Sequence, residues 1–475
     1  MRGPNALSQI DSRRGGSRRT LCFAAIIAVG FALRFVGIES RSLWGDEGLT
    51  LLIAQRSLVA LFLAPFDPTP GLYYLLHKLL IGPDAGVLAV RSISLIAGTA
   101  AIAAMYATAR LSRVPALLAA LLIALSFPLI DYSQEARAYS LSVLMILLSG
   151  CALIWWDRTR RLPAMLAFAA FTTLSFYTHF VSVFWIIPAV AGFITLALRD
   201  GDGRRQVGLV LILMVLLAAP EAYRLLHYQR DSFTWIPQAS PMEAVTILSY
   251  TQLPFGLFEN DRWHLGRELT AIASVMCYGL LGLLAVRHRR KLKQWAYENQ
   301  AAAIFVLIGL SAPIAIWLFG YVATAIFMPR TTLIGVPGFI LAVALLLKFE
   351  HRPARFLIVG LFAISLALTG TVRPKEDWRP VAHLLESRVR WGDVVILCAS
   401  WKAMAFRHAI RTRVDAPLLI VGTQGTFLIE QNLGSSRFWA KNYAQVLNAR
   451  SGSAEAQAAL RNSNRIWRIN SGCAD

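Results

Sequence analysis

The sequence has little charge and lacks the motifs of soluble nucleotide-binding enzymes. Asp, Glu, Lys and Arg make up 16% of its 475 residues, whereas soluble proteins average about 25%. It contains neither a P-loop nor a GxGxxG motif, so it offers no site for a soluble nucleotide sugar. Its five cysteines lie far apart and form no CxxC pair, which leaves no zinc-ligand spacing. The composition therefore points away from a soluble enzyme.

Long apolar runs take the place of the missing charge. Hydrophobic residues make up 56% of the chain, and a helix of about 20 apolar residues crosses the hydrocarbon core of a bilayer. This length predicts an α-helical polytopic membrane protein with about eleven transmembrane helices. The expected spans are residues 20–38, 84–109, 114–130, 139–156, 162–177, 180–198, 207–222, 269–286, 301–319, 331–347 and 355–371.

The net charge of +20 lies in short basic clusters between the apolar runs. The clusters follow alternate predicted spans, as the positive-inside rule describes for cytoplasmic segments. We therefore predict a cytoplasmic N-terminus and an external C-terminal region, and we do not interpret the charge as a nucleic-acid site. The clusters are the N-terminal tail, Arg110 with Arg113, and the stretches 158–161, 199–205, 287–293 and 348–355.

The first external loop, residues 39–83, contains two short apolar segments. Residues 48–63 include Gln55 and Arg56, and residues 71–81 end with His77 and Lys78. Both segments are too short or too polar to span a bilayer. We predict two helices that lie along the membrane surface.

The composition changes after residue 371. A helix-like stretch over 380–390 precedes short apolar runs at 394–397 and 418–421, which are typical of strands. We therefore predict a transmembrane domain over 1–371 and a small soluble α/β domain over 372–475 on the outer side.

An adjacent carboxylate pair, Asp46 and Glu47, opens the first apolar segment of the external loop. In one interpretation the two acids sit at a helix N-terminus, where the helix dipole favours negative charge. In the other, one acid is a general base toward an acceptor hydroxyl. The second acid then holds a divalent cation or orients the acceptor. The position beside the bilayer favours the second interpretation.

Four more residues on predicted external turns could contribute to a site. Glu135 and Arg137 lie between two spans, where they form either a local ion pair or part of a binding site. His179, in a tight turn, is either structural or a ligand for metal or substrate. Arg330 enters a span from outside, where it either snorkels to the interface or binds a lipid phosphate.

Several of these stretches resemble the polytopic glycosyltransferases of the GT-C fold. The resemblance is strongest to the bacterial branch of glycosyltransferase family 39, which is related to protein O-mannosyltransferases and to the aminoarabinose transferase of lipid A. The matching motifs are LWGDEGL at 43–49, DPTPGLYYLL at 67–76, YSQEARAYSL at 132–141, YTHF at 177–180, FMPRTTL at 327–333 and EDWRPVAHLL at 376–385.

The resemblance implies an inverting glycosyltransferase in the bacterial inner membrane. The donor would be a polyprenyl-phosphate sugar, and the acceptor a lipid, a glycan or a protein on the periplasmic face. It places catalytic residues at Asp46 and Glu47. It places donor or substrate contacts at Asp67, Glu135, Arg137 and Arg330, and we add Tyr73 and His179, which lie in the matching motifs, as candidate contacts.

The chain departs from the family pattern at Thr69-Pro70-Gly71-Leu72, where relatives often have His-Pro-Pro-Leu. The missing histidine removes a possible metal contact, so a divalent metal ion is a possible cofactor rather than a required one. The candidate ligands are Glu47, Asp67, Glu135 and His179.

Two other classes of protein fit the same residues. A transporter or flippase of a lipid-linked sugar would use the same phosphate-binding arginines and would need no base. However, transporters place their sites near the middle of the bilayer, whereas these residues cluster toward one face. A membrane scaffold whose outer domain binds a cell-wall partner is the third possibility.

Overall fold

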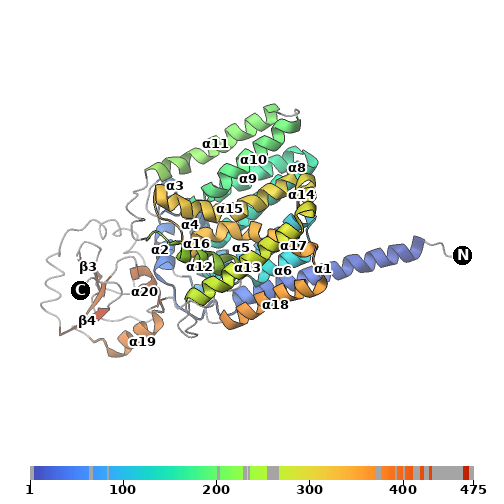
Figure 1. Ribbon diagram of the computed structural model, residues 1–475. Helices are drawn as coiled ribbons and strands as arrows, with labels where there is room; N and C mark the ends of the chain where they lie inside the picture. The colour runs from blue at the N-terminus through green and yellow to red at the C-terminus, as the bar shows by residue number, and fades with distance from the viewer. Residues whose placement is uncertain are drawn as a thin grey trace.

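A bundle of long helices forms most of the molecule (Figure 1). The computed structural model describes residues 5–63, 68–82, 85–200, 204–227, 233, 236–253, 267–369, 376–390, 393–398, 402–409, 418–421, 427–430 and 464–469. The long helices are α1 (Asn5–Phe35), α5 (Val87–Leu111), α8 (Tyr139–Thr159), α9 (Leu162–Phe176), α10 (Val183–Asp200), α11 (Arg204–Leu226), α13 (Arg267–Arg287), α15 (Gln300–Val322), α17 (Val336–Lys348) and α18 (Arg352–Thr369).

Shorter helices connect and cover this bundle. Near one end of it lie α2 (Gly45–Ala54), α3 (Leu58–Leu63), α4 (Gly71–Leu80), α12 (Pro241–Gln252) and α16 (Pro329–Thr332) (Figure 1). The other short helices are α6 (Ala116–Leu125), α7 (Phe127–Asp131), the 3-10 turn η1 (Tyr132–Gln134) and α14 (Arg289–Glu298). The two apolar segments of the first loop are helical as predicted, and the second segment matches α4.

Each of the eleven predicted spans overlaps a helix of the structure. Among the described residues, six helices are long and apolar enough to cross a membrane, or seven when the bent pair α6 and α7–η1 counts as one span. α9 and the apolar part of α13 are shorter than a full crossing. The predicted polytopic helical fold is therefore confirmed.

A buried arginine on α1 stabilises the bend between α6 and α7. The two segments meet at 65° because Pro128 has no N–H to donate to the carbonyl of Ala124. Arg34 Nη1 donates instead to that carbonyl at 3.1 Å, and Nη2 donates to the carbonyl of Ile123 at 3.1 Å. A long-range contact thus satisfies the broken end of α6, and the chain turns toward the loop that carries Arg137.

The C-terminal region contains a four-stranded sheet with two helices. Its strands are β1 (Asp393–Cys398), β2 (Leu418–Val421), β3 (Phe427–Glu430) and β4 (Arg465–Ile469), and its helices are α19 (Arg379–Arg388) and α20 (Ala403–Ala409). The order is β3-β2-β1-β4, with β1 parallel to both neighbours and β2 antiparallel to β3. The predicted helix and both predicted strands are confirmed, so the α/β character follows from the sequence.

The start of this region binds the segment between α1 and α2 through the EDWR motif. The backbone N–H of Ser42 donates to Asp377 Oδ1 at 3.2 Å, and the N–H of Trp378 donates to Ser42 Oγ at 2.8 Å. The Arg379 guanidinium donates to both oxygens of Asp377, from Nε to Oδ1 and from Nη2 to Oδ2, and lowers the pKa of that carboxyl to about 2. Asp377 is therefore a charged link between two distant segments.

Helix α20 packs directly on α2, the helix that begins with the acidic pair. A Cβ atom added at Gly48 would lie 2.5 Å from the backbone nitrogen of Ala405, so the helices touch where glycine has no side chain. One apolar cluster spans both regions. Its members include Leu43, Leu51, Leu52, Trp378, Leu385, Val395, Leu397 and Phe406.

We expect Gly48→Ala to destabilise this contact. The new methyl group must displace the backbone of α20, and overpacking of this kind costs about 1–3 kcal/mol. The control is Gly279→Ala on α13, where a Cβ meets nothing within 4 Å. There the change should stabilise the helix by about 0.5–1 kcal/mol. Thermal unfolding in detergent measures both, and equal shifts for the two variants would contradict the close contact.

Candidate functional site

Asp46 and Glu47 point to different surroundings, because successive residues of a helix lie about 100° apart. Glu47 is fully buried and accepts hydrogen bonds from Arg91 at both oxygens, at 2.8 Å from Nε and 2.7 Å from Nη2. It also accepts from the backbone N–H of Ala136 at 2.8 Å and of Trp44 at 3.1 Å. These contacts fix α2 against α5 and against the turn between η1 and α8.

Asp46 instead faces a pocket and pairs with an arginine from the far end of the sequence. Asp46 Oδ2 lies 3.2 Å from Arg330 Nη1, and the two side chains are 28% and 22% exposed. Arg330 follows Pro329 at the start of α16. The structure therefore brings the predicted base and the predicted phosphate ligand together across 284 residues of sequence.

Arg137 forms the floor of the same pocket. Its guanidinium donates to Thr69 Oγ1 at 3.0 Å, to the Tyr74 hydroxyl at 3.2 Å and to the Asp46 carbonyl at 3.4 Å. The side chain is 5% exposed. Its contacts with α2, α4 and the turn before α4 hold this positive charge in place.

The pocket has a volume of about 170 Å³ and combines charged and apolar walls. The rings of Phe180 and Phe233 are tilted against each other with centroids 5.3 Å apart, and the ring centroid of His179 lies 5.6 Å from that of Tyr139. The lining residues are Asp46, Pro68, Thr69, Arg137, Tyr139, His179, Phe180, Phe233, Ile236, Ile326, Met328, Arg330 and Thr331. A polar group and an apolar chain can thus bind side by side.

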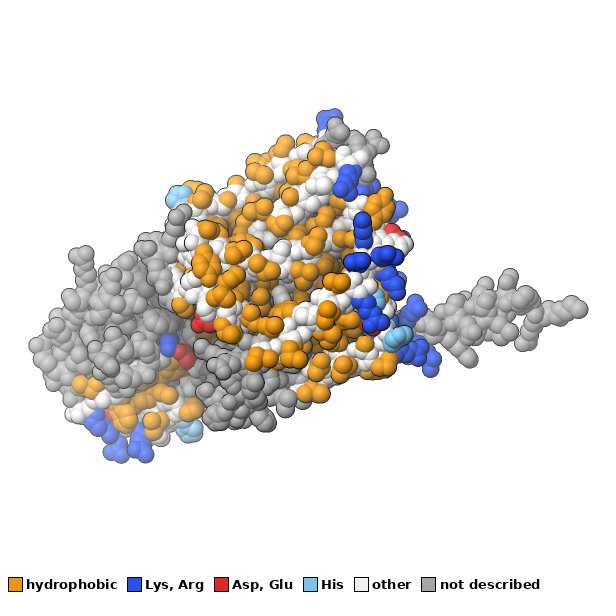
Figure 2. All heavy atoms as spheres, in the orientation of Figure 1, with side chains coloured by type: hydrophobic (Ala, Val, Ile, Leu, Met, Phe, Trp, Pro, Cys, Tyr) orange, Lys and Arg blue, Asp and Glu red, His pale blue; other side chains and the backbone are white. Residues whose placement is uncertain are grey.

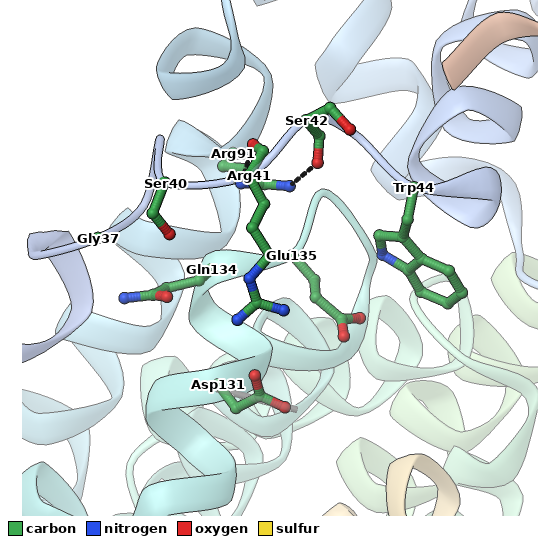
Figure 3. Close-up of a pocket in the computed structure, with 9 residues that line it drawn as sticks. All are labelled: Gly37, Ser40, Arg41, Ser42, Trp44, Arg91, Asp131, Gln134 and Glu135. Carbon is green, nitrogen blue, oxygen red and sulfur yellow. Dashed lines mark hydrogen bonds between the residues drawn. The ribbon is translucent and has the colours of Figure 1, made fainter. Parts of the chain in front are cut away.

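Glu135 lies in a second, smaller pocket rather than in this one (Figure 3). There the Arg41 side chain extends toward Glu135 and Asp131, with Trp44 beside them. The volume of about 20 Å³ is close to that needed by one water molecule, about 10–15 Å³. Glu135 and Arg137, two residues apart in the sequence, therefore line different cavities.

The remaining predicted site residues have other positions. The hydroxyl of Tyr73 lies 2.7 Å from Ser94 Oγ, and its side chain is fully buried below the pocket residues. Asp67 lies outside the described residues. Asp46, Arg137, His179 and Arg330 therefore share the pocket, whereas Glu47, Glu135 and Tyr73 do not line it.

In the part of the chain that the structure describes, we find no set of ligands for the predicted metal ion. Within it, no three His, Cys, Asp or Glu side chains gather as a metal site. Both oxygens of Glu47 are engaged by Arg91 and by backbone N–H groups. Asp67, another candidate ligand, lies outside the described residues. The metal ion therefore stays a prediction, and we derive no chemical step from one.

Sequence reasoning missed Arg91, Glu221 and Arg224, which are buried at the same end of the bundle. Glu221 and Arg224 on α11 pair at 2.7 Å, and Arg224 Nη2 donates to the carbonyl of Pro68 at 3.1 Å. Each lies within or beside an apolar run, where charge is costly and commonly functional. Their position in or beside apolar runs could have identified these three residues from the sequence.

His77 on α4 is buried near the site. It is 0% exposed, and within the described residues neither ring nitrogen makes a hydrogen bond. Burial lowers its pKa from 6.5 to about 4. The folded protein therefore holds His77 neutral at neutral pH.

We expect this histidine to make the fold sensitive to mild acid. The unfolded chain takes up the proton first, so stability is complete above pH 6.5 and falls until about pH 4. A pKa difference of this size corresponds to a loss of about 3 kcal/mol. Thermal unfolding in detergent between pH 7.5 and 4 measures it. His77→Leu should remove the step, and the exposed His351→Gln should keep it; a step that survives in His77→Leu would assign it to another group.

The fold defined by this bundle and its end pocket is that of the GT-C polytopic membrane proteins, as the sequence predicted. ArnT from Cupriavidus metallidurans bound to undecaprenyl phosphate shares it with a TM-score of 0.53 and 15% identity, over 84% of this chain and 86% of that chain. The apo structure of ArnT gives a TM-score of 0.52 and 15% identity, over 86% and 87%.

More distant similarity adds nothing to this assignment. An Archaeoglobus fulgidus oligosaccharyltransferase tethered to an acceptor peptide has a TM-score of 0.43 and 12% identity, over 82% of this chain and 63% of that chain. No protein-family model matches the sequence, and no curated protein matches it.

Proposed function

We propose that this protein is an inverting glycosyltransferase that uses a polyprenyl-phosphate sugar. The observation that carries the proposal is the placement of Asp46 beside Arg330 and Arg137 in one pocket with an apolar wall. A carboxylate can accept a proton, and guanidinium groups suit a phosphate. The similar fold of ArnT, which was solved with undecaprenyl phosphate, adds support for a lipid-phosphate donor.

The proposed reaction is a single displacement at the anomeric carbon. The acceptor oxygen forms a bond to that carbon while its proton passes to Asp46. The bond from the anomeric carbon to the phosphate oxygen breaks, and polyprenyl phosphate leaves with its negative charge beside Arg330 and Arg137. Because the oxygen attacks opposite the leaving group, the configuration inverts. Fixed positive charge at the developing phosphate lowers the barrier.

The proposed location is the bacterial inner membrane, with the pocket on the periplasmic face. Figure 2 shows Lys and Arg gathered at the end of the bundle from which α1 extends, away from the sheet. The positive-inside rule places that end in the cytoplasm. The pocket and the C-terminal sheet then face the periplasm, where the acceptor is a lipid, a glycan or a protein.

Two measurements test this function. Mass spectrometry of envelope glycans and glycolipids, with and without the gene, should name the sugar and its acceptor. Purified protein given that donor and acceptor should release polyprenyl phosphate as the product forms. Movement of intact donor across a vesicle membrane without such release would instead identify a flippase. A glycan lost on deletion but restored by Asp46→Asn would indicate a scaffold.

A further inference from the structure

We propose that the Glu221–Arg224 pair on α11 is a positioning device for the pocket, which holds the turn before α4 so that Arg137 faces the donor phosphate. The inference rests on the proposed function and adds two residues to its machinery. Neither residue lines the pocket, so the pair acts through the turn and not on the substrate.

Helix α11 is otherwise a poorly packed apolar helix. In the most apolar stretch of α11, 22% of the residues are buried, which is the smallest share among the six candidate spans. Leu213, Val215, Leu216 and Leu217 are exposed. Yet Glu221 and Arg224, three residues apart on its inner face, are 0% and 1% exposed. Glu221 and Arg224 therefore lie in the well-packed part of this helix, near its C-terminal end.

A buried ion pair is not an efficient way to stabilise such a helix. Removing two charges from water costs several kcal/mol per ion, and apolar residues of similar volume often serve the fold equally well or better. The pair has good geometry: Arg224 Nε and Nη2 contact the two Glu221 oxygens at 2.8 and 2.7 Å. Its retention in an apolar helix needs a reason other than stability.

The contact from Arg224 to the pocket supplies that reason. Arg224 Nη2 donates to the carbonyl of Pro68 at 3.1 Å. The next residue, Thr69, accepts from Arg137 Nη2 at 3.0 Å. Glu221 orients Arg224, Arg224 fixes the turn, and the turn fixes one arm of the Arg137 guanidinium. Pro68 and Thr69 themselves line the pocket.

If the pair positions the turn, its replacement should lower the activity without lowering the stability. The double variant Glu221→Leu/Arg224→Met replaces the pair with apolar groups, so the melting temperature should stay within a few degrees of the wild type. Without the bond to Pro68, the turn and Arg137 shift, and transfer should fall by about 10-fold to 100-fold, since misplacement near 1 Å has effects of this size. The loss should appear as a raised KM for the donor together with a lowered kcat.

The experiment compares this double variant with Arg224→Lys and the wild type in the polyprenyl phosphate release assay, with melting temperatures measured in parallel. Arg224→Lys keeps one donor for Pro68 and should retain more activity than the double variant. A stable double variant with wild-type kcat and KM would overturn the positioning role. So would activity that falls in strict proportion to the folded fraction. A wild type that releases no polyprenyl phosphate would instead refute the proposed function.

The control matches the pair in type but lies at the opposite end of the bundle. Asp157, in the last turn of α8, and Arg160, the residue after its end, form a pair at 3.0 Å with side chains 17% and 38% exposed. Asp157→Leu/Arg160→Met also removes two opposite charges from a helix end, and it should leave both kcat and donor KM unchanged. A comparable loss of activity in this control would show that the effect at α11 is not specific to the pocket turn.

Discussion

Asp46→Asn should lower sugar transfer by about 100-fold to 10,000-fold, the range of a lost general base. The amide keeps the shape of the side chain and can still contact Arg330, but it cannot take a proton from the acceptor. The loss should lie in kcat, because the proton moves in the transition state and not when the donor binds. Release of polyprenyl phosphate by purified, folded protein measures it.

Stability should hardly change in this variant. The Asp46–Arg330 pair is partly exposed, and pairs of that kind contribute up to about 1 kcal/mol. Asp157→Asn, at the other end of the bundle, is the matched control and should keep full activity. Full activity in Asp46→Asn would remove this carboxylate from the mechanism, whatever the donor.

Glu47→Gln should have the largest effect on stability. The Glu47 carboxylate forms an ion pair with Arg91, and the side chains of Arg91 and Glu47 are 7% and 0% exposed. Removing one partner leaves the charge of Arg91 buried without its counter-ion, which costs about 3–5 kcal/mol. A lower melting temperature and a smaller folded yield in detergent should both follow.

The comparison with an exposed pair isolates the effect of burial. Arg113 and Glu298 lie 3.7 Å apart with side chains 60% and 44% exposed, so Glu298→Gln should cost less than about 1 kcal/mol. In Glu47→Gln/Arg91→Met the buried charge is gone, and part of the lost stability should return. If Glu47→Gln shifts the melting temperature no more than Glu298→Gln does, Glu47 is not the anchor of α2.

The helices and the polar pocket residues followed from local patterns in the sequence. Apolar runs predicted the spans, and polar residues on turns pointed to Asp46, Arg137, His179 and Arg330, which the structure places in one pocket. Their chemical roles remain predictions. Local patterns also predicted strands at 394–397 and 418–421, because short apolar runs bounded by polar residues leave few alternatives.

The contacts between individual side chains could not be predicted from local patterns, because they depend on which distant segments meet in the fold. Proximity in sequence suggested that Glu47 works with Asp46, yet α2 turns it toward Arg91. Glu135 and Arg137 are separated in the same way, by the turn between η1 and α8. The order of the sheet, with β4 beside β1, joins strands 72 residues apart at Asp393 and Arg465, which no local pattern encodes.

Helix α2, in the predicted transmembrane domain, packs against α20, which lies beyond the change in composition at residue 371. Leu43, Leu51 and Leu52 are almost fully buried, and part of their cover comes from Trp378, Leu385 and Phe406. A chain ending at residue 371 would lack this cover over the three leucines, and Leu51 and Leu52 lie on α2, the helix that also carries Asp46. Among the described residues, the C-terminal region contacts α2 but does not line the pocket. We therefore expect it to influence Asp46 indirectly, by holding α2 in its packed position.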